Sequence, residues 1–342
     1  MATALLLCGG SYAQNTQPEK KPKAYVVADA HLDTQWNWDV QTTIKHHVWN
    51  TISQNLLLLK QYPDYIFNFE GGVKYAWMKE YYPAQYEEMK KYIREGRWHI
   101  SGASWDANDV LVPSTESVIR NIMLGQEYYR QEFGVESTDI FLPDCFGFGK
   151  QLPSIIKHAG LKGFSTQKLS WGSAYGVPFD TGIWKGIDGS EVFACLDAKS
   201  YRYKFEGDIR GDLSVINKIS RNAFEGGLPQ TMHLYGTGDW GGSPTEESVQ
   251  AVEESVAKNG DSDFEVVSAS TDEFFNDLAK LPEEEKKKLP CWDGELLMTS
   301  HGAGAYTARA MNKRLNAQNE TLADETERLC TAAQCAGVYN YP

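Results

Sequence analysis

The sequence contains no apolar run long enough to cross a membrane, which takes about 18 residues. Basic side chains are also in short supply, because 33 Lys and Arg stand against 46 Asp and Glu among 342 residues, giving a formal net charge of −13. Binding to phosphate groups depends on a surplus of Lys and Arg. The composition therefore argues against nucleic acid as the main partner, and equally against an anionic membrane surface.

Cysteines are few and scattered, and none forms a Cys-x-x-Cys pair. They cannot build a disulfide framework, and they do not identify the cellular compartment. The six are Cys8, Cys145, Cys195, Cys291, Cys330 and Cys335. With 42% hydrophobic and 12% aromatic residues, disorder is excluded as well. The length fits about two domains, or one large α/β barrel with a short addition.

The first 23 residues predict a leader rather than part of a fold. Residues 1–13 combine a short apolar run with a small-x-small pattern at Ser11–Ala13, as in a secretory signal peptide whose basic start is missing. The polar, proline-containing stretch 14–23 is typical of a linker. This segment predicts a periplasmic or secreted protein, and an unstructured tail is the plainer alternative.

Residues 24–290 alternate short strand-like runs with amphipathic helical patterns. Such alternation predicts a parallel sheet with helices outside it. Seven units in this length fit a (β/α)7-type barrel, and an open doubly wound sheet is the alternative. The predicted strands are 24–28, 66–69, 98–100, 139–142, 163–166, 192–195 and 232–235, and the helical patterns are 41–61, 72–95, 114–132, 151–159, 209–223 and 244–258.

The character of the sequence changes over residues 291–342. Tyr306–Ala336 is one long helical pattern with few strand formers, which predicts the start of a helical bundle domain. An amphipathic helix needs a partner for its apolar stripe. No further helical pattern follows, so the sequence predicts a truncated second domain and a chain that is a fragment.

The first predicted strand ends in His31-Leu32-Asp33, with Trp36 close behind. Side chains two residues apart in an extended chain point the same way, so His31 and Asp33 can meet at the carboxyl end of the strand. Imidazole and carboxylate together suit zinc, and an indole offers a stacking face to a sugar. A hydrogen-bonded structural pair is an equally good interpretation.

Two further loops present carboxylates after predicted strands. Asp144 follows an apolar strand and precedes Phe and Gly residues, as a nucleophile or metal ligand would, although turn-forming or helix-capping Asp residues look the same. Asp239 lies in a glycine-rich loop without the basic residue of a phosphate site. Two carboxylates from separate loops are what glycoside hydrolysis requires. His301 and Tyr306 follow later in a motif that could reach the same place.

Four motifs occur in order and together resemble the N-terminal catalytic region of glycoside hydrolase family 38, the retaining α-mannosidases. The resemblance covers about residues 24–330. The motifs are His-x-Asp-x-x-Trp from His31, Pro-Asp-x-Phe-Gly from Pro143, Gly-x-Gly-Asp-x-Gly-Gly-x-Pro-Thr from Gly236, and Glu-Leu-(x)4-His-Gly-x-Gly-x-Tyr-Thr from Glu295. A looser segment from Trp105 to Ser117 is also similar.

The resemblance implies one Zn²⁺ per chain, held by His31, Asp33 and Asp144. It further implies that Asp144 is the nucleophile and Asp239 the acid/base. Trp36, Trp105 and Asp109 would bind the sugar. The fourth zinc ligand of the family is a His in the helical bundle, which has no counterpart here, and the family's β-sandwich domains are absent too.

The leading hypothesis is therefore a zinc-assisted hydrolase that cleaves terminal α-mannosidic bonds with retention, acting on a mannose-containing oligosaccharide or glycan. Association of identical chains is left open. A truncated, catalytically impaired mannosidase or sugar-binding remnant is the first alternative. A metal-dependent carbohydrate deacetylase is the second, although the sequence offers no His-x-x-x-His ligand pair.

Overall fold

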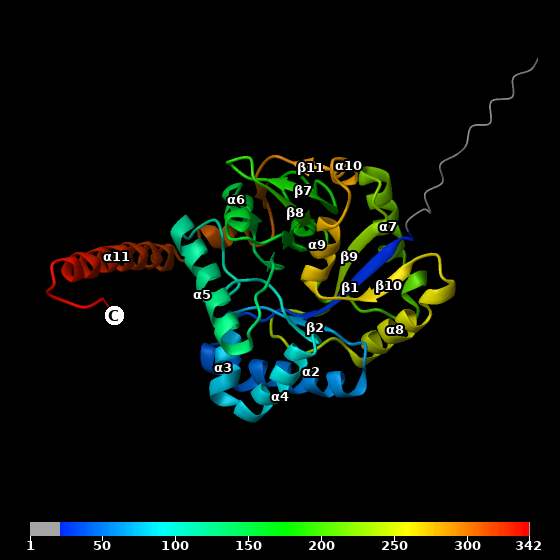
Figure 1. Ribbon diagram of the computed structural model, residues 1–342, viewed down its shortest axis with the longest axis horizontal. Coiled ribbons are helices and arrows are strands. Elements are labelled where there is room, and N and C mark those ends of the chain that lie inside the picture. The colour runs from blue at the N-terminus through cyan, green and yellow to red at the C-terminus, as the bar shows by residue number, and fades with distance from the viewer. Residues whose placement is uncertain (1–20, 342) are drawn as a thin grey trace, which may run out of the picture.

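The computed structural model describes residues 21–341 (Figure 1). The predicted signal segment 1–13 and residues 14–20 of the predicted linker lie outside the described residues. Over the described range, we find no helix that is both long and apolar enough to cross a membrane.

All seven predicted strands are present, and every pair that they form with one another is parallel. In one sheet, β1 pairs with β2 and β9, and β2 pairs with β3; in the other, β4 pairs with β6, and β6 pairs with β8. The prediction of a parallel sheet is thus confirmed. The strands are β1 (Lys23–Ala30), β2 (Phe67–Phe69), β3 (Trp98–Ile100), β4 (Asp139–Phe141), β6 (Gly163–Ser165), β8 (Glu191–Cys195) and β9 (Gln230–Thr237).

Five further strands were not predicted, and with them the strands divide into two larger sheets instead of one. Together with the seven they form two five-stranded sheets, of which one contains β1, β2, β3, β9 and β10 and the other β4, β6, β7, β8 and β11. The pair β7–β8 is antiparallel. A two-stranded sheet joins β5 and β12. The added strands are β5 (Gly147–Phe148), β7 (Thr181–Lys185), β10 (Glu265–Ser268), β11 (Cys291–Trp292) and β12 (Leu296–Leu297).

The expected single (β/α)7 barrel is therefore not confirmed by the strand pairing. Backbone hydrogen bonds nevertheless connect the two sheets at both junctions. The amide of Ala103, after β3, donates to the carbonyl of Asp139 in β4 at 3.0 Å, and Leu234 in β9 donates to Ala198, after β8, at 2.7 Å. Side chains from both sheets also share one buried cluster, which includes Tyr25, Phe141 and Cys195.

Helices surround the two sheets (Figure 1). The predicted helical pattern 72–95 divides at Pro83, because proline disfavours the helical conformation in the residue before it, and Tyr82 leaves the helical region with φ −132° and ψ 53°. The main helices are α1 (Val40–Thr42), a π-helix (Thr43–Val48), α2 (Trp49–Gln61), α3 (Gly72–Tyr81), α4 (Pro83–Arg94), α5 (Thr115–Phe133), α6 (Gln151–His158), α7 (Leu213–Gly226), α8 (Glu246–Ala257), α9 (Thr271–Ala279) and α10 (Glu283–Lys286).

The long helix predicted near the C-terminal end is observed as α11 (Ala310–Cys335). It projects from the rest of the molecule (Figure 1), and none of its residues is buried. Its contacts with α5 are polar, since Ser117 donates to Glu320 at 2.7 Å and Arg120 pairs with Glu327 at 2.6 Å. Its place in a helical bundle stays a prediction.

Gly125 allows α5 to lie directly on the loop that follows β3. A Cβ atom at this position would stand 2.3 Å from the carbonyl oxygen of Ala103 and 2.6 Å from the amide of Trp105. Both are backbone atoms, which cannot turn aside as a flexible side chain would. The close approach matters for the site because the same loop continues to Asp109.

We expect Gly125→Ala to lower the free energy of unfolding by about 1–3 kcal/mol, as overpacking of a fixed site does. This cost outweighs the roughly 1 kcal/mol that Ala gains over Gly inside a helix. Urea unfolding followed by circular dichroism measures it. Gly211→Ala is the matched control, because nothing lies within 4 Å of a Cβ there. Equal stability of the two variants would contradict the close contact.

Candidate active site

His31, Asp33 and Asp144 converge at the carboxyl ends of two strands. His31 directly follows β1, Asp33 lies two residues further on, and Asp144 comes just after β4. One ligand atom from each lies within 4.8 Å of the others, and among the described residues this is the group of acidic, His or Cys side chains that could hold a metal ion. The two-residue spacing aims the first two side chains the same way.

His31 is buried, and its two ring nitrogens have different surroundings. Nδ1 lies 3.1 Å from Oε1 of Glu70. Nε2 lies 3.6 Å from Oδ1 of Asp33 and has no hydrogen-bond partner, although it is buried. Burial alone lowers the pKa of His31, but the neighbouring carboxylates of Asp33 and Glu70 outweigh it and raise the pKa to about 10. The pocket thus attracts positive charge at this point, as a proton or as a cation.

Asp144 is held by two side chains that the sequence analysis did not single out. The hydroxyl of Tyr201 donates to its Oδ1 at 3.0 Å, and the ammonium of Lys168 pairs with the same oxygen. Lys168 is only 2% exposed, and its Nζ lies over the rings of Phe146, at 5.0 Å, and Trp171, at 4.9 Å. A buried lysine without a counter-ion is costly, so this ammonium needs the Asp144 carboxylate.

Asp239 reaches the same place from the loop after β9. Its backbone is left-handed, with φ 65°, and its carbonyl accepts a hydrogen bond from the amide of Asp33 at 2.7 Å. Its carboxylate pairs with Arg202. The backbone contact therefore ties the Asp239 loop to the loop that carries His31 and Asp33.

The Tyr201 hydroxyl connects the two candidate catalytic carboxylates. It lies 3.0 Å from Oδ1 of Asp144 and 3.2 Å from Oδ1 of Asp239. Those two oxygens are consequently no more than about 6.2 Å apart. Retaining glycosidases keep their two carboxyl groups about 5–5.5 Å apart, whereas inverting enzymes need roughly 6.5–9.5 Å to admit a water molecule.

Two cavities meet at this cluster, and Asp33, Asp144 and Phe146 line both. The first cavity, of about 270 Å³, is also lined by His31 and Asp109, together with Tyr306 and Lys313. The second cavity, of about 300 Å³, is also lined by the following residues: Trp36, Lys168, Trp171, Tyr201, Arg202, Asp239 and His301. Aromatic walls with a few converging charges are typical of small-ligand sites.

The three predicted sugar-binding residues differ in their placement. Trp36 lines the second cavity and is 58% exposed. Asp109 lines the first cavity, where it accepts the amide of Leu111 at 2.7 Å and burial raises its pKa. Trp105 lines neither cavity. Its ring packs on Tyr128 of α5, with ring centroids 5.5 Å apart.

Glu70, Lys168, Tyr201 and Arg202 were missed by sequence reasoning. Glu70 follows β2, a three-residue strand, and lies in no motif that carries chemistry. Lys168 lies in a short 3₁₀ helix after β6, while Tyr201 and Arg202 come from an irregular stretch after β8. The available signal was their position, because each follows a predicted parallel strand at its carboxyl end.

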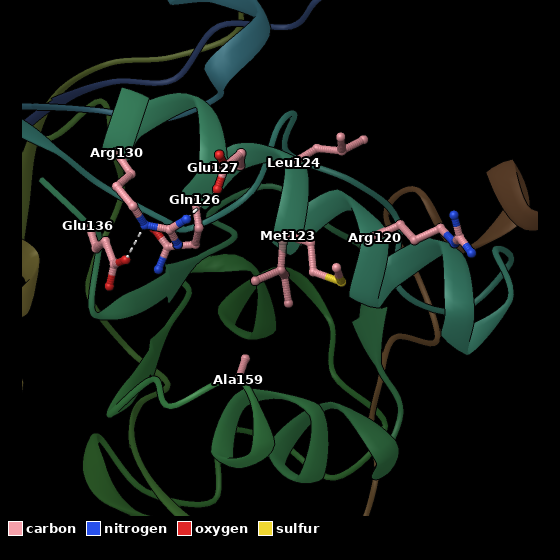
Figure 2. A pocket seen from close by; sticks show the side chains of 9 residues that line it. Arg120, Met123, Leu124, Gln126, Glu127, Arg130, Glu136 and Ala159 are labelled. Carbon is pink, nitrogen blue, oxygen red and sulfur yellow. Dashed lines mark hydrogen bonds and ion pairs between the residues drawn. The ribbon is translucent and has the colours of Figure 1, made fainter. Parts of the chain in front are cut away.

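A larger hollow lies elsewhere, along the outer face of α5 and opposite Ala159 (Figure 2). Its volume is about 620 Å³, and exposed Met123 and Leu124 contribute apolar surface. An ion pair between Arg130 and Glu136 closes one end, at 2.8 Å. The hollow contains none of the converging carboxylates and is separate from the candidate active site.

Comparison of the sequence with known proteins shows the family to which the chain belongs. Residues 21–295 match the family model for the glycosyl hydrolases family 38 N-terminal domain. Alpha-mannosidase G of Dictyostelium discoideum is 33% identical over 311 residues, which are 91% of this chain and 28% of that protein. Human alpha-mannosidase 2C1 is 30% identical over 317 residues, or 92% of this chain and 29% of that protein. The chain thus spans less than a third of the length of these relatives.

Solved structures agree on the fold. An alpha-mannosidase from Enterococcus faecalis V583 superimposes with a TM-score of 0.62 at 21% identity, covering 81% of this chain and 31% of that one. A 4-alpha-glucanotransferase from Thermococcus litoralis superimposes with a TM-score of 0.55 at 13% identity, covering 90% and 47%. By the match of residues 21–295, the chain belongs to the glycosyl hydrolase family 38 N-terminal domain family.

Proposed function

We propose that this chain carries the catalytic centre of a retaining α-mannosidase that removes terminal mannose from a glycan with the assistance of zinc. The observation that carries the proposal is the position of the Tyr201 hydroxyl, 3.0 Å from Asp144 and 3.2 Å from Asp239. It keeps one oxygen of each carboxylate within about 6.2 Å of the other, below the roughly 6.5–9.5 Å of inverting enzymes, which supports a retaining mechanism. The named relatives are alpha-mannosidases, and their names are the ground for proposing mannose as the sugar that is released.

Asp144 is the nucleophile in this proposal. Its carboxylate attacks the anomeric carbon, and the bond from that carbon to the glycosidic oxygen breaks. Asp239 gives its proton to the departing oxygen and then removes a proton from the water that hydrolyses the ester on Asp144. Lys168 and Tyr201 hold the nucleophile through the Oδ1 atom that they share.

His31, Asp33 and Asp144 fit zinc by two features of the structure. Their candidate ligand atoms lie within 4.8 Å of one another, and the buried Nε2 of His31 has no hydrogen-bond partner. One imidazole and two carboxylates are ligands that Zn²⁺ accepts. When bound, the ion would supply positive charge that orients the hydroxyl groups of the sugar beside the two carboxylates.

The sugar would lie where the two cavities meet. Trp36 offers an exposed aromatic face, and Asp109 is placed to accept hydrogen bonds from hydroxyls. Trp105, which lines neither cavity, would act indirectly, because its packing on Tyr128 of α5 anchors the loop that continues to Asp109. The two sheets would act as the halves of a barrel-like (β/α) unit, in which the two junction hydrogen bonds continue the pairing.

The test is hydrolysis of 4-nitrophenyl α-mannoside by the 342-residue chain supplied with zinc, with the β-mannoside as control. We expect release of nitrophenol from the α-anomer and none from the β-anomer. Binding of mannose without turnover would instead favour a sugar-binding remnant. Release of acetate from an acetylated sugar would favour a deacetylase and contradict the proposal.

A further inference from the structure

Glu70 occupies a buried position directly behind His31. It follows the last residue of β2 and precedes α3 by two residues, and its side chain is only 3% exposed. Its Oε1 lies 3.1 Å from Nδ1 of His31. A carboxylate can only accept a hydrogen bond, so this contact requires the proton of the imidazole on Nδ1.

The proton on Nδ1 determines what the other nitrogen can do. In a neutral imidazole with Nδ1 protonated, Nε2 carries a lone pair and no proton. That Nε2 is the atom that lies without a hydrogen-bond partner near Asp33. Glu70 therefore favours the tautomer in which Nε2 is free to bind a cation.

Lys74, in the first turn of α3, holds Glu70 in place. Lys74 is fully buried, and its Nζ lies 3.1 Å from Oε1 of Glu70 and 3.4 Å from Oδ1 of Asp106. The glycine at position 71 makes room for this ammonium, since a Cβ there would stand 3.0 Å from Nζ, and its φ of +91° suits glycine. A burial this complete restricts the lysine to one arrangement.

The same contacts reach a second loop of the site. The hydroxyl of Thr34, next to Asp33, donates to Oδ2 of Asp106 at 2.6 Å. Asp106 lies in the loop after β3, three residues before Asp109. Glu70, Lys74 and Asp106 thus connect the loop that carries the metal-binding side chains with the loop that carries Asp109.

A purely structural ion pair elsewhere in the chain provides the comparison. Lys218 and Asp180 are also buried and pair at 2.6 Å, and Asp180 accepts further hydrogen bonds from Asn222 and Thr231. Neither belongs to the candidate metal cluster. The Glu70–Lys74 pair differs because its carboxylate also contacts His31.

We propose that Glu70, anchored by Lys74, is the positioning residue that presents Nε2 of His31 to the metal. The inference rests on the proposed zinc-assisted function and adds a role that no sequence motif indicated. Carboxylates behind a metal-binding His raise the basicity of the ring and fix its orientation, and their loss weakens metal affinity about 10–100-fold.

The experiment measures Zn²⁺ affinity of the 342-residue chain by competition with a fluorescent chelator. The test variant is Glu70→Leu combined with Lys74→Met, which removes both charges of the pair, because a lone buried Lys would destabilise the fold. The control is Asp180→Leu combined with Lys218→Met. We expect the dissociation constant for Zn²⁺ to rise about 10–100-fold in the first variant and to stay unchanged in the second.

Absorption of the Co²⁺-loaded protein provides a second readout, because its visible bands report the ligand geometry. We expect the bands to change for the Glu70–Lys74 variant and not for the control. Wild-type affinity and bands in that variant would overturn the role of Glu70 and leave the zinc proposal standing. A wild-type chain that binds neither ion would overturn the metal site itself, and this inference with it.

Discussion

Asp144→Asn is expected to lower kcat/KM for 4-nitrophenyl α-mannoside by at least about 10⁴-fold, the scale on which loss of a covalent nucleophile acts. The neutral amide oxygen is a far weaker nucleophile than a carboxylate. The substitution retains the shape of the side chain, and its oxygen can still accept hydrogen bonds from Lys168 and Tyr201. Because the substitution also leaves buried Lys168 without its counter-ion, thermal unfolding of the variant is measured beside the assay, and a folded variant that has lost activity assigns the loss to chemistry.

Because Asp144 is also a candidate metal ligand, zinc content is measured on the same samples. A reduced content that is restored by added zinc without recovery of activity separates the nucleophile from the ligand. Asp64→Asn is the control. Asp64 is exposed and lies in neither cavity, and its substitution removes the same negative charge. An Asp144→Asn enzyme within tenfold of the wild type would rule out the assignment.

Asp239→Asn is expected to affect substrates according to their leaving groups. For an alkyl α-mannoside, whose departing oxygen needs a proton, we expect kcat/KM to fall about 10²–10⁴-fold. For 4-nitrophenyl α-mannoside, kcat/KM should fall much less, because nitrophenolate leaves without protonation. Steady-state assays of the two substrates side by side measure the difference.

Azide tests the second half of the same prediction. It needs no general base, so it can attack the anomeric carbon of the ester in the Asp239→Asn variant, displace the Asp144 carboxylate and form α-mannosyl azide. We expect azide to raise the turnover of the nitrophenyl substrate in this variant and to leave the Asp64→Asn control unchanged. An equal loss with both substrates and no effect of azide would show that Asp239 is not the acid/base.

The parallel strands could be predicted because buried strands of a parallel sheet are continuous apolar runs. Tyr25 to Ala28 is such a run, and all its residues are buried. The strands β5, β11 and β12 have two residues each, too few for a pattern, and the five-residue antiparallel strand β7 contains Gly182 and ends in Lys185, so it is not a continuous apolar run. Their pairing depends on where the chain already lies, so the division into two sheets was not visible in the sequence.

In the candidate site, too, the sequence predicts local geometry but not the contacts between distant loops. The spacing of His31 and Asp33 puts both side chains on one side of an extended chain, and this holds without knowledge of the fold. The contact of Tyr201 with both Asp144 and Asp239 depends on bringing together three loops that are far apart in the sequence. Lys168 and Lys74 are buried cations, and a sequence gives no reason to bury one until its counter-ion is placed.

The configuration of the first sugar released tests the central claim most directly. Hydrolysis of 4-nitrophenyl α-mannoside by the wild-type chain is followed by ¹H NMR over the first minutes, before the free sugar equilibrates. Two successive displacements, first by Asp144 and then by water, predict that α-mannose appears first and β-mannose follows by mutarotation. Initial release of β-mannose would show a single displacement by water and would contradict the role of Asp144 as nucleophile.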